Sequence, residues 1–358
     1  MSVGACPHGR GPGPGFEALW TPRIGRVTLC LALSGASPRR AFRIPAWAGG
    51  GPRTTNIMRR LLKVLGYVAA GAGALILIAA AAVYGFSESR YRKQYAVAPR
   101  VITVPTDSTV IARGEHLAQT FGGCVECHGE NLAGKVVFDD PPVGRVYGAN
   151  LTRGKGGIGA ALTDADIMRA MQHGVGRDGR PLKVMPSTDY VHLTESDLAA
   201  IVAWVKTRPA VDMAQPPVRV GPVGRVLFLA GKLPILHAER IDHARPATMT
   251  VSEGATAAYG KYIAAVGCQG CHGQTLAGGP IEGGAPNWPP AANLTPAGSL
   301  KGWTEAGFTT FLRTGKRPDG TPVSDVMPIR LTKRLTDEEI HALWLHLQTV
   351  PAAEMASR

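Results

Sequence analysis

Two short strings constrain this chain more than any other feature. Residues 124–128 read Cys-Val-Glu-Cys-His, and residues 268–272 read Cys-Gln-Gly-Cys-His. Each is a C-x-x-C-H motif, the attachment signature of a c-type haem. Side chains three and four positions apart share one face of a helix, so two thiols can bond to one porphyrin while the histidine points at its iron. The motifs predict two covalent haems, held by Cys124, Cys127 and His128 and by Cys268, Cys271 and His272.

Two other kinds of site use a C-x-x-C pair. Half of a zinc site is one, but zinc usually draws its ligand pairs from nearby in the sequence, and neither motif has a second pair close to it. A thiol–disulfide couple is the other, but it is expected beside a βαβ pattern and gives no reason for a histidine after both second cysteines. Haem attachment explains both cysteines and the histidine of each string, so we favour it.

The motifs belong to an internal repeat, which is the feature to establish before any fold assignment. Matching pairs follow the two motifs in the same order: Asn-Leu-Ala-Gly at 131–134 and Thr-Leu-Ala-Gly at 275–278, Ala-Asn-Leu-Thr at 149–152 and 292–295, and Val-Met-Pro at 184–186 and 326–328. The chain therefore contains two copies of one small domain.

Two methionines, Met185 and Met327, lie at matching positions in the copies, each directly before a proline. Haem iron in electron-carrier cytochromes binds histidine on one side and methionine on the other. We therefore predict His128 with Met185, and His272 with Met327, as the axial ligands. His173 is the rival sixth ligand in the first copy, but its counterpart in the second copy falls at residues 313–314, which cannot ligate iron.

Each copy is expected to open and close with a helix. Thr194 and Thr336 each stand three residues before an acidic residue, a common helix start, and apolar residues then recur at helical spacing. Gly114 and Gly260 lie inside the opening helices, where glycine costs about 1 kcal/mol relative to alanine. A close crossing with the closing helix would explain that cost.

Residues 64–86 contain no charged side chain and exceed the roughly 20 apolar residues that span a bilayer. We interpret them as an uncleaved transmembrane signal-anchor helix. Arg59, Arg60 and Lys63 precede the span, and the positive-inside bias places that side in the cytoplasm. Because c-type haems are attached outside the bacterial cytoplasmic membrane, the two haem domains are expected in the periplasm.

The first 57 residues are rich in Gly, Pro and Arg and show no sustained period. We interpret residues 1–57 as upstream reading frame, with translation beginning at Met58, or as a disordered cytoplasmic tail. Much of the formal charge of +13 lies in residues 1–63, and the haem propionates would offset part of the remainder. The charge is therefore no sign of nucleic-acid binding.

Residues 103–208 and 252–350 are each long enough for a small helical domain. Residues 209–251 between them are rich in proline and read as a linker. Its apolar stretch, residues 226–230, could pack between the domains or touch the membrane surface, and the sequence does not choose.

The order of C-x-x-C-H, Asn-Leu-Thr, Met-Pro and a short capped helix resembles class I cytochrome c domains. Residues 157–159, 162–166 and 173–174 extend the resemblance to the membrane-bound cytochrome subunits of bacterial alcohol and gluconate dehydrogenases. Those subunits typically carry three haem motifs, and this chain has two. The resemblance implies an all-α fold with two tandem class I cytochrome c domains after the transmembrane helix. It also implies Asn150 and Asn293 as candidate ligands of the haem propionates.

These features predict an electron carrier rather than an enzyme: a membrane-anchored dihaem cytochrome c. Its donor would be a periplasmic dehydrogenase or quinol, and its acceptor a cytochrome or terminal oxidase. A dihaem peroxidase or thiosulfate dehydrogenase is the enzymatic alternative, although a peroxidase needs an open iron site and both copies offer methionine. A permanent dihaem subunit of a haem–copper oxidase is a further alternative.

Overall fold

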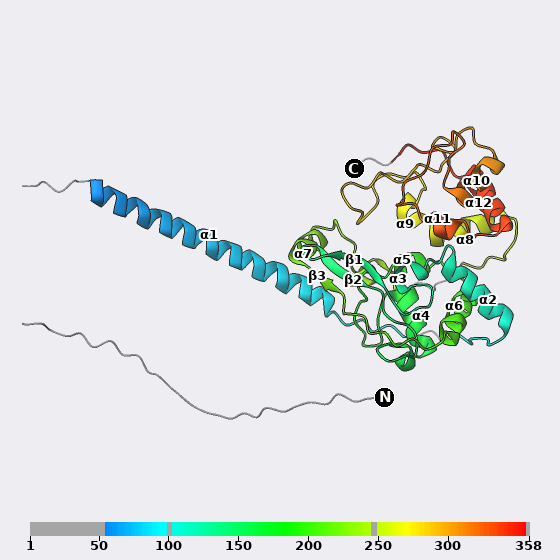
Figure 1. Cartoon of the computed structure of the whole chain (residues 1–358), viewed down its shortest axis with the longest axis horizontal. Helices are drawn as coiled ribbons and strands as arrows, with labels where there is room; N and C mark the ends of the chain where they lie inside the picture. The colour runs from blue at the N-terminus through cyan, green and yellow to red at the C-terminus, as the bar shows by residue number, and fades with distance from the viewer. Residues whose placement is uncertain (1–53, 99–101, 245–248, 356–358) are drawn as a thin grey trace, which may run out of the picture. The chain divides into compact units, whose positions relative to one another are not determined.

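The computed structural model describes residues 54–98, 102–244 and 249–355 (Figure 1). The chain divides into two units, residues 1–63 and 64–358. Its elements are α1 (Thr54–Tyr91), α2 (Ser108–Gln119), α3 (Val125–His128), β1 (Val136–Asp140), β2 (Gly144–Tyr147), the 3-10 turn Gly159–Ala161, α4 (Asp164–His173), α5 (Ser187–Tyr190), α6 (Glu195–Thr207), β3 (Arg219–Val220), α7 (Pro222–Leu229), the 3-10 turn His237–Arg240, α8 (Ala257–Gly267), α9 (Gln269–His272), α10 (Glu305–Thr314), α11 (Ile329–Thr332) and α12 (Asp337–Thr349). The predicted all-α fold is confirmed, with one small sheet added to it.

Helix α1 contains the predicted span and extends beyond it at both ends. Within the described residues it is the one helix long and apolar enough to cross a membrane, with a mean hydropathy of 2.2 in its most apolar window and none of that window buried. It begins at Thr54, so residues 54–57 of the predicted N-terminal extension are helical. The rest of that extension, with Cys6 and Cys30, lies outside the described residues.

The opening and closing helices of each copy cross at a glycine. A Cβ atom on Gly114 of α2 would lie 1.9 Å from the backbone oxygen of Ala200 on α6, and a Cβ on Gly260 of α8 would lie 1.9 Å from that of Ala342 on α12. No side chain fits at either position. The predicted close crossing is confirmed in both copies, and it explains why glycine stands in the middle of these helices.

The closing helices begin where predicted. The hydroxyl of Thr194 accepts a hydrogen bond from the backbone N–H of Asp197 at 3.1 Å, and that of Thr336 accepts one from Glu339 at 3.1 Å. These side chains satisfy N–H groups that have no partner inside the helix. The apolar stripes face inward: the buried members are Leu198, Ile201, Val202 and Val205 in α6 and Ile340, Leu343 and Leu347 in α12.

The segment predicted as a linker packs along the first copy. Its strand β3 pairs with β2, which also pairs antiparallel with β1, giving the order β1-β2-β3. Residues 211–213 supply two backbone carbonyls to the side chain of Asn150, at 2.8 and 2.9 Å. Every residue has a main-chain carbonyl, so a sequence pattern does not show which carbonyls make contacts. The composition of this segment therefore predicted only a linker.

The two copies share one hydrophobic core. Its buried residues include Leu117, Phe121 and Tyr190 of the first copy and Tyr262 and Leu343 of the second. The rings of Phe121 and Tyr262 meet edge to face with their centroids 5.9 Å apart. The two helical domains therefore pack against each other within the unit of residues 64–358.

Candidate functional site

Each C-x-x-C-H motif forms a single helical turn. Cys124 caps α3, which runs to His128, and Cys268 caps α9, which runs to His272. All four motif cysteines are free of disulfides. Burial raises the pKa of Cys124 and of Cys268 to about 12, so both thiols are protonated at neutral pH. The two cysteines and the histidine of each motif therefore lie within one helical turn.

The motif histidines are oriented by backbone carbonyls. Nδ1 of His128 lies 2.8 Å from the oxygen of Ala149, and Nδ1 of His272 lies 2.8 Å from that of Ala292. Because a carbonyl can only accept, Nδ1 carries the proton and Nε2 keeps its lone pair for a metal. Burial lowers the pKa of both imidazoles, which favours the neutral form that binds iron.

The loops that follow the motifs have the same backbone in both copies. Leu132 and Leu276 are buried yet adopt positive φ angles of 56° and 57°, a conformation uncommon for leucine. Gly148 permits a close approach to the first motif, since a Cβ there would lie 1.7 Å from the backbone oxygen of Cys127. The surroundings of the two motifs are thus built twice on one plan.

The predicted axial methionines lie in equivalent places. Met185 and Met327 are partly buried and pack against the shared core, each one residue before a proline that precedes a short helix, α5 or α11. The copies differ in one respect. Val184 has a φ of 70° and donates its N–H to the oxygen of Ile235 at 2.7 Å, so the segment predicted as a linker also holds the chain beside Met185.

The propionate role implied for Asn150 and Asn293 does not fit their contacts. Both N–H groups of Asn150 bind backbone carbonyls, and its oxygen accepts from the N–H and hydroxyl of Thr152. Asn293 donates to the oxygen of Ala353 at 2.7 Å and accepts from the N–H of Thr295. These amides instead fix the segments that follow the closing helices α6 and α12.

His173, the rival sixth ligand, lies at the end of α4. Its Nδ1 is 3.2 Å from Nδ1 of His243, which belongs to the segment predicted as a linker. The two rings have centroids 5.3 Å apart. The structure thus gives His173 a histidine neighbour, which the sequence pattern did not suggest.

Each attachment motif lies beside the short helix that follows the methionine of the other copy. Asp189 of α5 approaches Gly270 in the motif of the second copy, where an added Cβ would be 2.8 Å from a carboxylate oxygen. Its neighbour Tyr190 donates its hydroxyl to the oxygen of Gly122, beside the motif of its own copy, at 2.9 Å. In the reverse direction, Arg330 of α11 in the second copy pairs with Glu126 of α3 in the first. The two sites therefore face a common interface.

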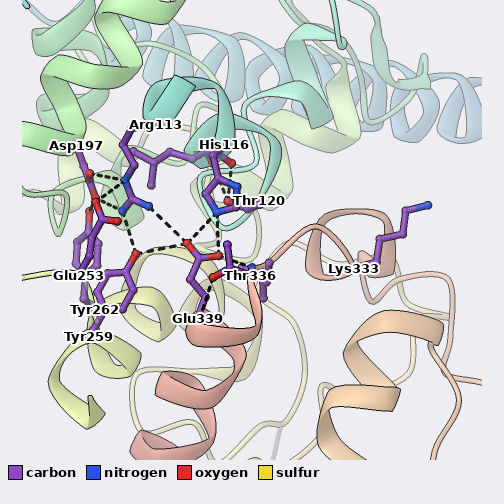
Figure 2. Close-up of polar contacts among 12 residues, drawn as sticks. Arg113, His116, Thr120, Asp197, Glu253, Tyr259, Tyr262, Lys333, Thr336 and Glu339 are labelled. Carbon is purple, nitrogen blue, oxygen red and sulfur yellow. Dashed lines mark hydrogen bonds and ion pairs between the residues drawn. The ribbon is translucent and has the colours of Figure 1, made fainter. Parts of the chain in front are cut away.

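A polar cluster joins the two copies (Figure 2). Arg113 donates to Asp197 at 3.0 Å within its own copy and to the hydroxyl of Tyr259 at 3.0 Å in the other. Glu339 lies between Arg113 and His116, with its oxygens 2.8 Å from Nε2 of His116. The hydroxyl of Tyr262 donates to Asp197 at 2.6 Å.

The cluster is symmetric in the repeat, and sequence reasoning missed it. Its members are equivalent in pairs: Arg113 with Tyr259, His116 with Tyr262, and Asp197 with Glu339. Each buried carboxylate accepts a hydrogen bond across the interface from an equivalent position, as in a two-fold dimer contact. A signal was present, because a buried acid at the third position of both closing helices needs a partner.

The donor set fits haem better than zinc. Among the described residues no group of three or more His, Cys, Asp or Glu side chains is arranged to hold a metal ion. Each motif instead offers two thiols on one helical turn and a histidine with Nδ1 already engaged. The residues present therefore fit a covalently attached porphyrin, whose iron Nε2 would bind.

Replacing Cys124 or Cys271 with alanine is expected to weaken attachment in one copy only, because one of two thioethers is lost. Haem staining of a denaturing gel should fall toward that of a single-haem protein, and a double variant in one motif should reach it. Glu338→Ala, an exposed residue outside both motifs, is the control. Undiminished staining of the double variant contradicts covalent attachment at these cysteines.

Comparison with protein families finds a separate match for each copy. Residues 111–209 match the family described as cytochrome c. Residues 255–347 match the family described as subunit III of cbb3-type cytochrome c oxidase. The matches cover the two copies separately and leave the segment between them outside.

Curated relatives include the cytochrome c subunit of quinone-dependent alcohol dehydrogenase from Gluconacetobacter polyoxogenes, 29% identical over 70% of this chain and 58% of the relative. The fructose dehydrogenase cytochrome subunit of Gluconobacter japonicus is 28% identical over 70% of this chain and 55% of the relative. A dihaem c-type cytochrome of Cereibacter sphaeroides is 27% identical over 68% and 86%. The chain thus spans less than two thirds of the dehydrogenase subunits.

Proposed function

We propose that this chain, a dihaem cytochrome c similar to the cytochrome subunits of dehydrogenases, is a membrane-anchored electron carrier of the periplasm. It receives electrons from a dehydrogenase or quinol and passes them to a cytochrome or terminal oxidase. The observation that carries the proposal is the pair of equivalent attachment sites facing one interface, with Tyr190 beside the first motif and Asp189 beside the second. Adjacent sites on one shared core suit transfer from one to the other.

The group that these residues hold supplies a one-electron iron couple, and the protein sets its ligands and surroundings. His128 and His272 present Nε2 because their Nδ1 atoms are fixed by backbone carbonyls. Met185 and Met327 are the proposed sixth ligands. Thioether ligation would close the remaining iron position and raise the potential, which would leave substrate no coordination site. This ligand set supports a carrier over a peroxidase.

The partner proposal rests on the relatives. Alcohol and fructose dehydrogenases are the enzymes named for two of them, which supports a periplasmic dehydrogenase as the donor. The second copy's match to a subunit of cbb3-type oxidase favours a second candidate, a permanent dihaem subunit of a haem–copper oxidase. Purification from native membranes under mild detergent distinguishes the two, since an oxidase core would accompany the chain only in the second case.

The membrane proposal rests on α1. Its residues 64–86 would reach about 34 Å at 1.5 Å per residue, which matches a hydrocarbon core of about 30 Å. The outward side chains Leu75, Ile76 and Leu77 are 68–71% exposed, as expected for a surface that lipid covers. With Arg59 and Arg60 in the cytoplasm, the haem domains lie on the periplasmic side.

The ferric full-length protein is expected to show two low-spin haems, a methionine–iron charge-transfer band for each, and no peroxide turnover. Met185→Leu and Met327→Leu should each remove one band and lower one potential, within the roughly 0.8 V range that axial ligands control. Absorption spectra and a redox titration measure both effects.

His173→Ala is the matched control, and it should leave both bands in place. Loss of a band in that variant would assign His173 instead of Met185 to the first iron. A high-spin ferric haem together with peroxide turnover would replace the carrier with an enzyme.

A further inference from the structure

Helix α7 exposes an apolar face to solvent. Its outward residues Pro222, Val223 and Val226 and the following Ala230 are all exposed, with Val223 and Val226 at 46% and 51%. The single charged residue of the helix, Arg225, does not belong to this face, since its side chain is only 14% exposed. The other side of α7 is buried through Phe228.

The buried side of α7 is fixed to the last turns of α1. Arg225 donates to the hydroxyl of Ser87 at 2.6 Å, and its guanidinium lies 4.5 Å from the ring centre of Tyr84. The ring of Phe228 stacks on that of Tyr91 with centroids 5.3 Å apart. These contacts join α7 to two successive turns of α1. Movement of α7 along or away from α1 would break them.

These contacts fix the position of α7 along the axis of α1, relative to the uncharged span. Tyr84 lies near the end of that span and Glu88 is the first charged residue after it. Tyrosines at the end of a span favour the boundary between lipid tails and headgroups. A helix packed against residues 84–91 therefore lies at the level of the headgroups.

The charges around α7 suit the same level. Arg219 and Lys232 flank the helix and are exposed, and Lys93 follows α1. Three of the nearby acids are paired: Glu88 with Arg92 and Arg225, Glu239 with Arg90, and Asp139 with Arg145. Asp140, at the end of β1, is exposed. An apolar face bordered by basic side chains is the pattern of a helix that lies in the surface of an anionic membrane.

We propose that α7 is an interfacial helix, lying in the headgroup region of the bilayer with Val223 and Val226 in contact with lipid. The inference rests on the membrane anchor proposed above. Two turns of helix bury too little apolar surface to bind a membrane alone, but attachment to α1 makes the contact intramolecular. The first haem domain is then held in one orientation at the membrane surface and does not move freely about its anchor.

A spin-label measurement on the full-length protein in nanodiscs containing anionic phospholipid tests the proposal. Single cysteines replace Val226, Leu77 and Ile158 in a background with Cys6→Ser and Cys30→Ser, and the power saturation of each label is referred to its own value under nitrogen, which removes the relaxation caused by the haem irons. The label at Val226→Cys is expected to gain oxygen accessibility and to lose accessibility to a water-soluble nickel complex. Ile158, also an exposed apolar residue at 44%, is the matched aqueous control.

The label at Leu77→Cys separates the two proposals, because it reports the span alone. If Leu77 is accessible from lipid while Val226 is as open to nickel as Ile158, the interfacial helix is wrong and the anchor stands. A label at Val226 shielded from both oxygen and nickel indicates a protein contact and also overturns the proposal. If Leu77 is open to nickel, the anchor and the interfacial helix both fail.

Discussion

Replacing Gly260 with alanine is expected to destabilise the second domain by at least about 3 kcal/mol, the upper part of the range for overpacked cores. The added Cβ would lie 1.9 Å from the backbone oxygen of Ala342 and 2.9 Å from the Cβ of His346. Neither is the end of a flexible side chain, so α8 and α12 must separate. Chemical denaturation of the detergent-solubilised protein, followed by circular dichroism and haem absorption, measures the loss.

Gly114→Ala should act equally on the first domain, since its Cβ would meet the oxygen of Ala200 at the same 1.9 Å. Gly71→Ala is the matched control: it also lies inside a helix, but nothing lies within 4 Å of its Cβ position. That variant should be neutral or slightly stabilising, because alanine favours helix over glycine. A Gly260→Ala protein as stable as the parent would contradict the close crossing.

Replacing Glu339 with alanine is expected to cost roughly 3–5 kcal/mol, the range for breaking a buried ion pair from one side. The side chain is 3% exposed and accepts from His116 and from the N–H of Thr336, so its loss leaves Arg113 and His116 short of a partner and α12 short of a cap. The unfolding midpoint of the full chain measures the effect. Glu338→Ala, an exposed neighbour in the same helical turn, is the control and should stay close to the parent.

The same carboxylate makes the stability depend on acid. Burial acts to raise the pKa of Glu339, but the hydrogen bond and charge of His116, with the Arg113 charge, outweigh it and hold the pKa below its ordinary value. A lowered pKa in the folded state means that the stabilisation is present above the unfolded value of about 4.3 and is lost as the pH falls through the folded one. Glu339→Gln should flatten this part of the pH profile, and an unchanged profile would contradict the assignment.

Local patterns carried the prediction of the secondary structure. Thr194 and Thr336 begin helices because each hydroxyl accepts a hydrogen bond from the N–H three residues later. Donor and acceptor are close in sequence, so the pattern is visible without a structure. Gly114 and Gly260 marked a helix crossing because a costly glycine needs a reason. Such features depend on residues within one turn or on one period, which a sequence displays directly.

The segment between the copies shows where that reasoning ends. Its proline content indicated a linker, yet it supplies β3 to a sheet, carbonyls to Asn150, and Ile235 to the residue before Met185. These contacts use main-chain groups, which every residue possesses. Composition therefore could not distinguish a free connection from one that packs along the first domain.

The sequence by itself determined the two haem attachments, the repeat and the apolar span, because each is written in side-chain types at short, regular spacing. Only the tertiary structure decided that the copies share one core and that Arg113, Asp197 and Glu339 meet across it. It alone fixed α7 against the end of α1. Contacts between residues distant in sequence depend on how helices dock, and docking is decided by the fit of whole surfaces that no local period records.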